Sequence, residues 1–137
     1  MLTSESKIRV RYSETDQMRY AYYGHYAAYY EVARTDLMRK IGLSYRQLED
    51  MGIIMPVVEM KIRYYKPARY DDVITVKVIV KEMPTARIMF YYEVYNEAGD
   101  KTNEGYTLMT FADMQTGRPM RPPKILLDAM RPYFENE

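Results

Sequence analysis

The sequence predicts an α+β fold in which a curved, five-stranded antiparallel sheet wraps around one long central helix. Three observations support this prediction. One strand-like segment comes first, a long helical segment follows it, and four more strand-like segments come next, joined by short loops. Strands that are joined by short loops pair in antiparallel fashion. Such a sheet must bury its apolar face, and the long helix is the only large element available to cover it.

The first third of the chain contains one strand and two helices. Apolar and basic residues alternate over Lys7–Ser13, which indicates a half-buried strand, and a polar turn around Asp16 follows. From about Gly24–Lys40, aromatic and apolar residues recur at spacings of three and four, which is typical of a helix. Gly42 can end this helix. A short second helix is expected over Ser44–Met51, with the serine as its N-cap.

The rest of the chain is dominated by strands. Four segments rich in alternating apolar residues are expected to form them: Ile53–Lys66, Val73–Lys81, Arg87–Asn96 and Lys101–Met114. The loop Glu97–Asp100 is typical of a hairpin. Gly105 lies inside the last strand, where glycine indicates a bulge or a close approach of another backbone. Pro122 and Pro123 are expected to precede a short C-terminal helix.

Composition limits the possible functions. A chain of 137 residues is expected to form one domain over residues 1–137, and its 20 basic and 19 acidic residues give no support to a nucleic-acid partner. The sequence contains no cysteine and one histidine, so it predicts no disulfide, no metal site and no cysteine nucleophile. No segment resembles a signal peptide or a membrane span, which favours a cytoplasmic protein. The 16 tyrosines and 12 methionines suit either a pocket for a flexible apolar ligand or ordinary core packing.

The polar turn and the helix after it carry the candidate chemistry. Asp16 precedes a helix whose N-terminus offers unpaired N–H groups and partial positive charge. Such a place can hold a polarised carbonyl beside a base or a nucleophile. Taken alone, Asp16 is more typical of an ordinary turn or N-cap carboxylate. His25 suggests helix capping or pocket lining, and Glu31 is spaced to form a structural ion pair with Arg34.

Several motifs resemble one family of enzymes. The matching residues are Tyr12-x-Glu14-Thr15-Asp16-Gln17-Met18, then Tyr22 and Tyr26, then Glu31-x-Ala33-Arg34-Thr35, with weaker matches at Lys66-Pro67-Ala68-Arg69, Gly105-Tyr106-Thr107 and Thr116-Gly117-Arg118-Pro119. This pattern, over roughly residues 7 to 123, is similar to the 4-hydroxybenzoyl-CoA thioesterase-like acyl-CoA thioesterases. The resemblance implies their hot-dog fold, in which a sheet wraps a central helix.

The resemblance also implies a site. Asp16 would be the catalytic carboxylate, acting as nucleophile or general base, and a backbone N–H near Tyr23 or Gly24 would polarise the thioester carbonyl. Coenzyme A would be part of the substrate, and no separate cofactor is implied. Its phosphates would be held by basic residues drawn from Arg69, Lys81, Arg87, Arg118 and Arg121. The family works as homodimers or homotetramers, with active sites between subunits.

Two positions depart from the family pattern. Many members have glycine in place of Arg19 and histidine in place of Tyr23, although one branch carries tyrosine there. Arg19 could narrow the pocket, contact the substrate, or pair with Asp16 and lower the pKa of that carboxyl group. The sequence therefore leaves alternatives open: a non-catalytic acyl-CoA or fatty-acyl binding module, an acyl carrier protein thioesterase, and a dehydratase of the same fold, which fits less well.

Overall fold

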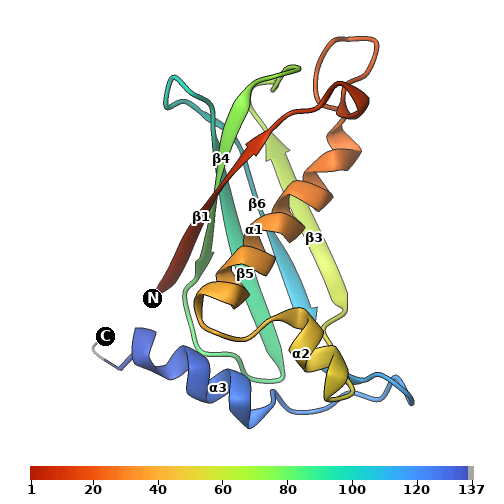
Figure 1. Cartoon of the computed structure of the whole chain (residues 1–137), viewed down its shortest axis with the longest axis vertical. Helices are drawn as coiled ribbons and strands as arrows, with labels where there is room; N and C mark the ends of the chain where they lie inside the picture. Colours follow the sequence, from red (N-terminus) through yellow and green to blue (C-terminus); the bar gives the residue numbers. More distant parts are fainter. Residues whose placement is uncertain (136–137) are drawn as a thin grey trace.

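The computed structural model describes residues 1–135 and shows a five-stranded antiparallel sheet packed on one long helix (Figure 1). The strands are β1 (Leu2–Arg9), β3 (Val57–Tyr64), β4 (Val73–Val80), β5 (Arg87–Tyr95) and β6 (Lys101–Thr110). They lie side by side in the order β1-β4-β5-β6-β3. The predicted fold class is confirmed. The strand order leaves β1 and β3 as the two edges of the sheet.

The central helix α1 (Tyr26–Lys40) follows a 3-10 turn, Tyr23–His25, and packs against the inner face of the sheet. Tyr30 is buried between the helix and the sheet, where its ring stacks on the ring of Tyr92 from β5 with centroids 4.0 Å apart. The Tyr30 hydroxyl donates a hydrogen bond of 2.7 Å to the side-chain carbonyl of Asn103 on β6. Because both groups are buried, this bond satisfies polar atoms that burial would otherwise leave unpaired.

Gly105 is a point of close backbone approach. It pairs with Ile62 across the β3–β6 ladder without a shift of register at that point. A Cβ atom at Gly105 would collide with the carbonyl oxygen of Lys61 and would lie 3.0 Å from the Tyr30 hydroxyl. Of the two alternatives that the sequence offers for this glycine, the structure therefore selects close approach and not a bulge.

Smaller elements close the end of the molecule opposite the start of α1 (Figure 1). They are α2 (Tyr45–Asp50), α3 (Lys124–Met130), a 3-10 turn (Arg131–Tyr133), and a two-stranded sheet of β2 (Ile53–Ile54) and β7 (Ala112–Asp113). Ser44 caps α2 as predicted: its hydroxyl accepts the Gln47 N–H at 3.1 Å, and the Gln47 side chain accepts the Ser44 N–H at 2.7 Å. Within residues 1–135, no helix has the length and apolar character needed to cross a membrane.

The predicted boundaries of the first strand are wrong. The strand begins at Leu2 and not at Lys7. It ends at Arg9, and Tyr12–Glu14 forms a 3-10 turn in place of the predicted continuation to Ser13. The chain leaves the sheet because the carboxylate of Glu14 accepts the N–H of Arg11, three residues earlier, and so closes a turn. Tyr12 is consequently exposed and lies outside the core.

Two other predicted strands are each split in two. Ile53–Lys66 divides into β2 and β3 around Pro56, which has no N–H to donate to a ladder. Lys101–Met114 divides at Phe111, where the chain passes from the large sheet to the small one. The proline gives the first break a local cause, whereas the second is decided by distant pairing partners, since β6 pairs with β3 and β5 and β7 pairs with β2.

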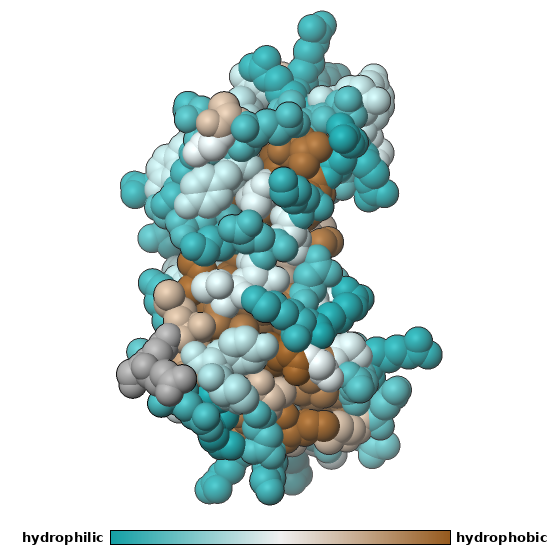
Figure 2. Space-filling model, turned by 60° about the vertical axis from the view of Figure 1, so that its left-hand side comes forward, coloured by the Kyte–Doolittle hydropathy of each residue, from teal (hydrophilic) through white to brown (hydrophobic). Residues whose placement is uncertain are grey.

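Edge strand β3 is poorly covered on both faces. The helix packs mainly against β1 and β4, at the other side of the sheet. The apolar side chains of Val58 and Met60 on β3 are therefore 53% and 44% exposed. By contrast, Figure 2 shows the side that lies to the left in Figure 1, where hydrophilic side chains predominate between smaller apolar patches. An edge strand with exposed apolar residues is a surface on which another strand can pair.

Candidate active site

The polar turn that follows the first 3-10 turn holds Asp16 in a fixed position. Thr15 and Ala21 form an isolated antiparallel bridge, and within it the Asp16 N–H donates to the Tyr20 carbonyl at 2.9 Å. The Asp16 side chain accepts the Met18 N–H on Oδ1, also at 2.9 Å. Within residues 1–135 the other oxygen, Oδ2, accepts no hydrogen bond. The turn therefore orients the carboxylate through one oxygen and leaves the second oxygen for another group.

Glu14 anchors this turn to the central helix. Its carboxylate accepts the Arg11 N–H at 2.8 Å and the Tyr29 hydroxyl at 3.2 Å, and its carbonyl accepts the Tyr22 N–H at 2.8 Å. Burial disfavours the charged carboxylate, but these hydrogen bonds and the Arg11 guanidinium outweigh it and hold the pKa of Glu14 below its usual value. The residue therefore links the Asp16 turn to the first turns of α1 while it stays ionised.

The entry of the helix exposes backbone donors. Tyr23 and Gly24 are the first two residues of the 3-10 turn, so the turn itself supplies no carbonyl for their N–H groups, and no other described residue accepts from them. Gly24 also has a steric role, because a Cβ atom there would lie 2.6 Å from a ring carbon of Tyr22. Two unpaired N–H groups at the start of a helix form a place where a partial negative charge is stabilised.

A cavity of about 270 Å³ brings the two features together. Its walls are formed by Asp16, Met18, Tyr20, Ala21, Tyr23, Tyr26, Tyr64, Tyr65, Lys66 and Pro67. Burial raises the pKa of Tyr26 to about 12, so its phenol stays protonated at neutral pH. The site thus places one partly exposed carboxylate in a mainly aromatic cavity at the start of a helix, with room for a small organic group.

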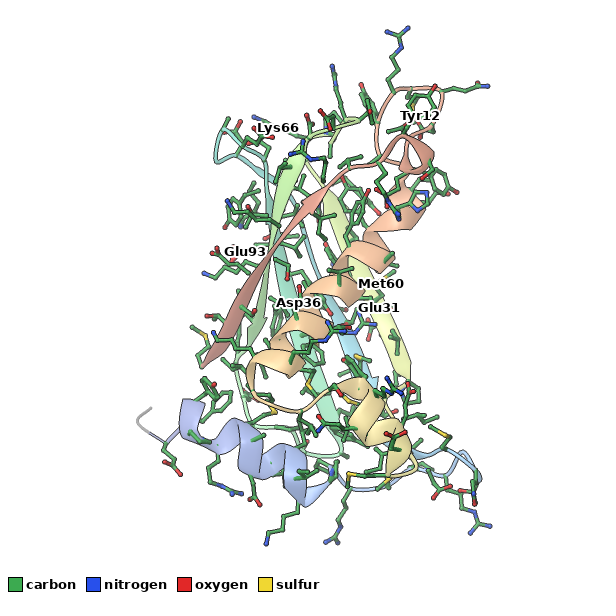
Figure 3. All side chains as sticks on the ribbon, viewed as in Figure 1. Tyr12, Glu31, Asp36, Met60, Lys66 and Glu93 are labelled. Atoms are coloured by element: carbon green, nitrogen blue, oxygen red, sulfur yellow. The ribbon has the colours of Figure 1, made fainter. Side chains whose placement is uncertain are left out.

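The cavity wall that comes from β3 is not evident from the sequence pattern. In the sequence, Tyr64 is only one of several apolar residues that alternate along a predicted strand. In the structure, its hydroxyl donates a hydrogen bond of 3.2 Å to the Tyr23 carbonyl. Lys66 and Pro67 follow in the next loop, and the Ala68 carbonyl accepts the Ala21 N–H at 2.7 Å. Lys66 and Tyr12 are both labelled near this end of the molecule in Figure 3. The family motif at 66–69 was the available signal, since it marks the loop that meets the Asp16 turn.

The five residues predicted to contact coenzyme A lie at two opposite ends of the folded molecule. Arg69 lies beside the cavity. It forms an isolated antiparallel β-bridge with Tyr20, and its guanidinium lies 5.4 Å from the centroid of the Tyr20 ring. Lys81 and Arg87 lie where β4 ends and β5 begins, which the strand register places at the opposite end of the sheet. Arg118 and Arg121 lie in the loop between β7 and α3, at that same far end. One chain therefore brings only Arg69 close to Asp16.

Three other roles that the sequence suggests, one of them only as an alternative for Arg19, are not found among the described residues. Arg19 forms no ion pair with Asp16; it is exposed, its φ is +67°, and its N–H donates to the Asp16 carbonyl at 2.9 Å. His25 precedes α1 without a capping hydrogen bond from its side chain, and it does not line the cavity. Glu31 and Arg34 form no ion pair within 4.0 Å, because Arg34 turns into the core towards Tyr92. No group of three or more acidic or histidine side chains in residues 1–135 is arranged to hold a metal ion.

Comparison with known proteins identifies the family. The thioesterase-like superfamily model matches residues 10–130. The putative acyl-CoA thioesterase YneP of Bacillus subtilis is 31% identical over 128 residues, which are 93% of each chain. Acyl-CoA thioester hydrolase YbgC of Escherichia coli O157:H7 is 29% identical over 120 residues, covering 88% of this chain and 90% of that protein.

Solved structures agree with this relationship. The DHNA-CoA thioesterase of Staphylococcus aureus is 34% identical and superposes with a TM-score of 0.86, covering 99% of this chain and 86% of the other. A hypothetical protein, TT1821, from Thermus thermophilus is also 34% identical, with a TM-score of 0.88 over 93% of this chain and 97% of that one. The sequence match and the shared arrangement of sheet and central helix show that this chain belongs to the thioesterase-like superfamily and has its hot-dog fold.

Proposed function

We propose that the protein is an acyl-CoA thioesterase that uses Asp16 and the backbone donors at the start of the central helix. One observation carries this proposal: Asp16 and Tyr23 line the same cavity, with unpaired N–H groups at Tyr23 and Gly24 beside it. The printed names of the relatives, which are acyl-CoA thioesterases and thioester hydrolases, support the reaction class.

In this proposal the thioester carbonyl oxygen points at the helix entry. The N–H groups of Tyr23 and Gly24 stabilise the negative charge that develops there, and one such donor is typically worth about 3 kcal/mol. The free Oδ2 of Asp16 then acts in one of two ways. It attacks the carbonyl carbon to form an acyl-enzyme anhydride that water hydrolyses, or it takes a proton from the attacking water. Both routes consume one water and release the carboxylic acid and the coenzyme A thiol.

We further propose that the active unit contains two copies of the chain. Lys81, Arg87, Arg118 and Arg121 lie at the end of the molecule far from Asp16, so within one chain they are badly placed for a ligand at that site. Antiparallel pairing of two β3 edges would reverse one copy relative to the other. That arrangement brings the far end of one copy towards the Asp16 end of its partner, and it also covers Val58 and Met60. A homodimer or a homotetramer of such dimers satisfies this geometry.

Thiol release from a panel of aromatic and aliphatic acyl-CoAs tests the proposed reaction. Asp16→Asn keeps the shape of the side chain, and we expect it to lower kcat by roughly 10²–10⁴-fold with little change in thermal stability. Asp50→Asn, at an exposed position of α2, is the matched control and should keep full activity. Near-complete activity in Asp16→Asn would show that this assignment is wrong.

The same assay separates the alternatives. Saturable binding of acyl-CoA without thiol release would indicate a binding module. Preference for acyl carrier protein thioesters over coenzyme A thioesters would indicate a carrier-protein thioesterase, and an enoyl product would indicate a dehydratase. A cytoplasmic location stays a prediction.

A further inference from the structure

One lysine lies in the wall of the Asp16 cavity. Residues 1–135 hold every lysine of the chain, and among them only Lys66 lines this cavity. It follows Tyr64 by two residues, just beyond the end of β3 (Figure 3). The proposed hydrolysis gives its amine no role, although a primary amine is one of the nucleophiles that react with a carbonyl carbon.

Lys66 has a fixed backbone and a long side chain whose tip rests outside the cavity. Its N–H donates a hydrogen bond of 3.0 Å to the Thr102 carbonyl. Its Nζ donates one of 3.1 Å to Oδ2 of Asp100, which lies in the turn between β5 and β6 and does not line the cavity. The side chain therefore begins at the cavity wall and is held at its tip by a residue of the turn.

The ion pair with Asp100 can open readily. The hydrogen bond from Lys66 and its charge hold the pKa of Asp100 below its ordinary value, so the carboxylate is ionised at neutral pH. Both side chains are about half exposed, 55% for Lys66 and 49% for Asp100, and an exposed ion pair of this kind contributes little to stability. Since the lysine stem is flexible, the released amine can turn towards the cavity.

We propose that Lys66 is a self-acylation site, at which the amine takes the acyl group from an acyl-CoA bound in the Asp16 cavity. This inference rests on the proposed function, because it requires the thioester to bind in that cavity. Binding places the thioester next to one particular lysine. Two reactants held together in this way react in an effectively unimolecular step, which accelerates a transfer that is slow in free solution.

The transfer balances without a further reactant. The neutral Nζ of Lys66 forms a bond to the thioester carbonyl carbon, while the N–H groups of Tyr23 and Gly24 stabilise the oxygen as they do in the proposed hydrolysis. The C–S bond then breaks, and the coenzyme A thiolate leaves and receives the proton that the amine gives up. The products are an amide at Lys66 and free coenzyme A, and nothing is oxidised or reduced.

Mass spectrometry of Asp16→Asn after incubation with acetyl-CoA or benzoyl-CoA tests the proposal. Trypsin does not cut between Lys66 and Pro67, so it releases the peptide 64–69, in which Lys66 is the only lysine. We expect this lysine to be acylated at least about tenfold faster than Lys7, an exposed lysine on the opposite edge strand of the sheet. Added free coenzyme A should slow acylation of Lys66 and not of Lys7. Equal rates at the two lysines, or no protection by coenzyme A, would overturn the proposal.

Variants in the same background locate the modification. Lys66→Arg keeps a cation for Asp100 and should abolish the label on the peptide 64–69. Asp100→Asn removes the ion pair and should speed acylation of Lys66 about two- to fivefold, the effect expected from loss of one exposed ion pair. Asp128→Asn, which breaks an equally exposed ion pair with Arg131, is the matched control and should leave the rate unchanged. An unchanged rate in Asp100→Asn would overturn the assignment.

Tyrosine esters are the competing product, because Tyr64 and Tyr65 belong to the same peptide and line the same cavity. Hydroxylamine cleaves an ester and leaves an amide intact. The label should therefore survive hydroxylamine. A label that hydroxylamine removes, or one that persists in Lys66→Arg, would place the acyl group on a tyrosine and would overturn the proposal.

Thiol release in the same incubations separates this inference from the proposed function. With a limited amount of acyl-CoA, the wild type should hydrolyse most of it, whereas Asp16→Asn should release one thiol for each acylated Lys66. Rapid release by the wild type, with no label at Lys66 in Asp16→Asn, would overturn self-acylation and leave the thioesterase proposal standing. Equal labelling of both proteins without rapid thiol release would support self-acylation and overturn the thioesterase proposal.

Discussion

The hydroxyl of Tyr64, at the end of β3, donates a hydrogen bond of 3.2 Å to the backbone carbonyl of Tyr23, 41 residues earlier at the entry of the central helix. That carbonyl also accepts the Tyr26 N–H. The carbonyl of Tyr23 and the N–H of Gly24 belong to the same planar peptide unit. By holding the carbonyl, Tyr64 therefore fixes the direction in which the Gly24 N–H points.

This relationship predicts a catalytic effect of Tyr64→Phe. Loss of one hydrogen bond should let the peptide unit rotate and weaken the proposed oxyanion site, lowering kcat for thiol release about three- to tenfold. Tyr70→Phe, an exposed tyrosine outside the cavity, is the control. If kcat of Tyr64→Phe equals that of the wild type, the orientation of this peptide does not depend on Tyr64.

Glu14 predicts a pH dependence of stability. Its pKa in the folded protein lies below the ordinary value of 4.5, so the folded state favours the ionised form. The resulting stabilisation is fully present above pH 4.5 and is lost as the pH falls from there through the lower pKa of the folded state. Glu14→Gln should therefore reduce the free energy of unfolding at pH 7, by about 1.5–3 kcal/mol for its hydrogen bonds.

Urea unfolding of the wild type and Glu14→Gln between pH 3 and pH 7 measures this effect. The difference between the two proteins should shrink steadily below pH 4.5. A difference that stays constant over this range would mean that packing of the side chain, and not its charge, stabilises the turn.

The fold could be predicted from local patterns, whereas much of the site could not. Helical spacing before Lys40 and alternation in the strands gave the architecture, because both patterns follow from which side chains are buried. Asp16 on its own is typical of a turn carboxylate, and the structure shows that it does serve the turn through Oδ1. Only the family motif distinguished it from other carboxylates in turns.

Arg34 illustrates the limit of local reasoning. Its spacing from Glu31 predicts an ion pair along the helix, but the side chain packs inward against Tyr92. The choice between these positions is made by residues from α2, β5 and β6, which a pattern of three or four residues does not contain. The same reason explains why the contribution of Tyr64 to the site could not be foreseen.

Arg19 predicts that a smaller residue will stabilise the protein. Its φ of +67° lies in the left-handed region, which costs a residue with a Cβ roughly 1–2 kcal/mol and glycine very little. Since Arg19 makes no ion pair in the described residues, Arg19→Gly should raise the free energy of unfolding by about 1 kcal/mol. Thermal or urea denaturation measures the change.

Asp71 provides the comparison for this variant. It also has a positive φ, +70°, but it forms an ion pair with Arg9 at 3.2 Å. Asp71→Gly should therefore gain less stability than Arg19→Gly. If Arg19→Gly is no more stable than the wild type, the arginine side chain makes a compensating contact in solution.

Gly105 predicts the opposite response. A Cβ at this position would meet the Lys61 carbonyl oxygen, which belongs to the backbone of the neighbouring strand and cannot move aside alone. Gly105→Ala should therefore lower the free energy of unfolding by about 1–3 kcal/mol, the usual cost of overpacking. The Tyr30 hydroxyl also lies nearby, so Tyr30→Phe combined with Gly105→Ala tests which neighbour matters. Recovery of stability in the double variant would show that the Tyr30 hydroxyl, and not the backbone, sets the limit.

The exposed edge of β3 predicts that a substitution that disrupts association of the chains will also weaken substrate binding. Met60→Lys introduces a charge where a second β3 strand would cover an apolar side chain. It should therefore shift the mass measured by light scattering towards that of the single chain, 16.4 kDa. Lys61→Gln, on the same strand, is the control and should keep the mass of the wild type.

Because Lys81, Arg87, Arg118 and Arg121 reach Asp16 only from a partner copy in this arrangement, the single chains should show a higher KM for acyl-CoA as well. A dimeric Met60→Lys protein, or a single-chain form with an unchanged KM, would contradict pairing through β3.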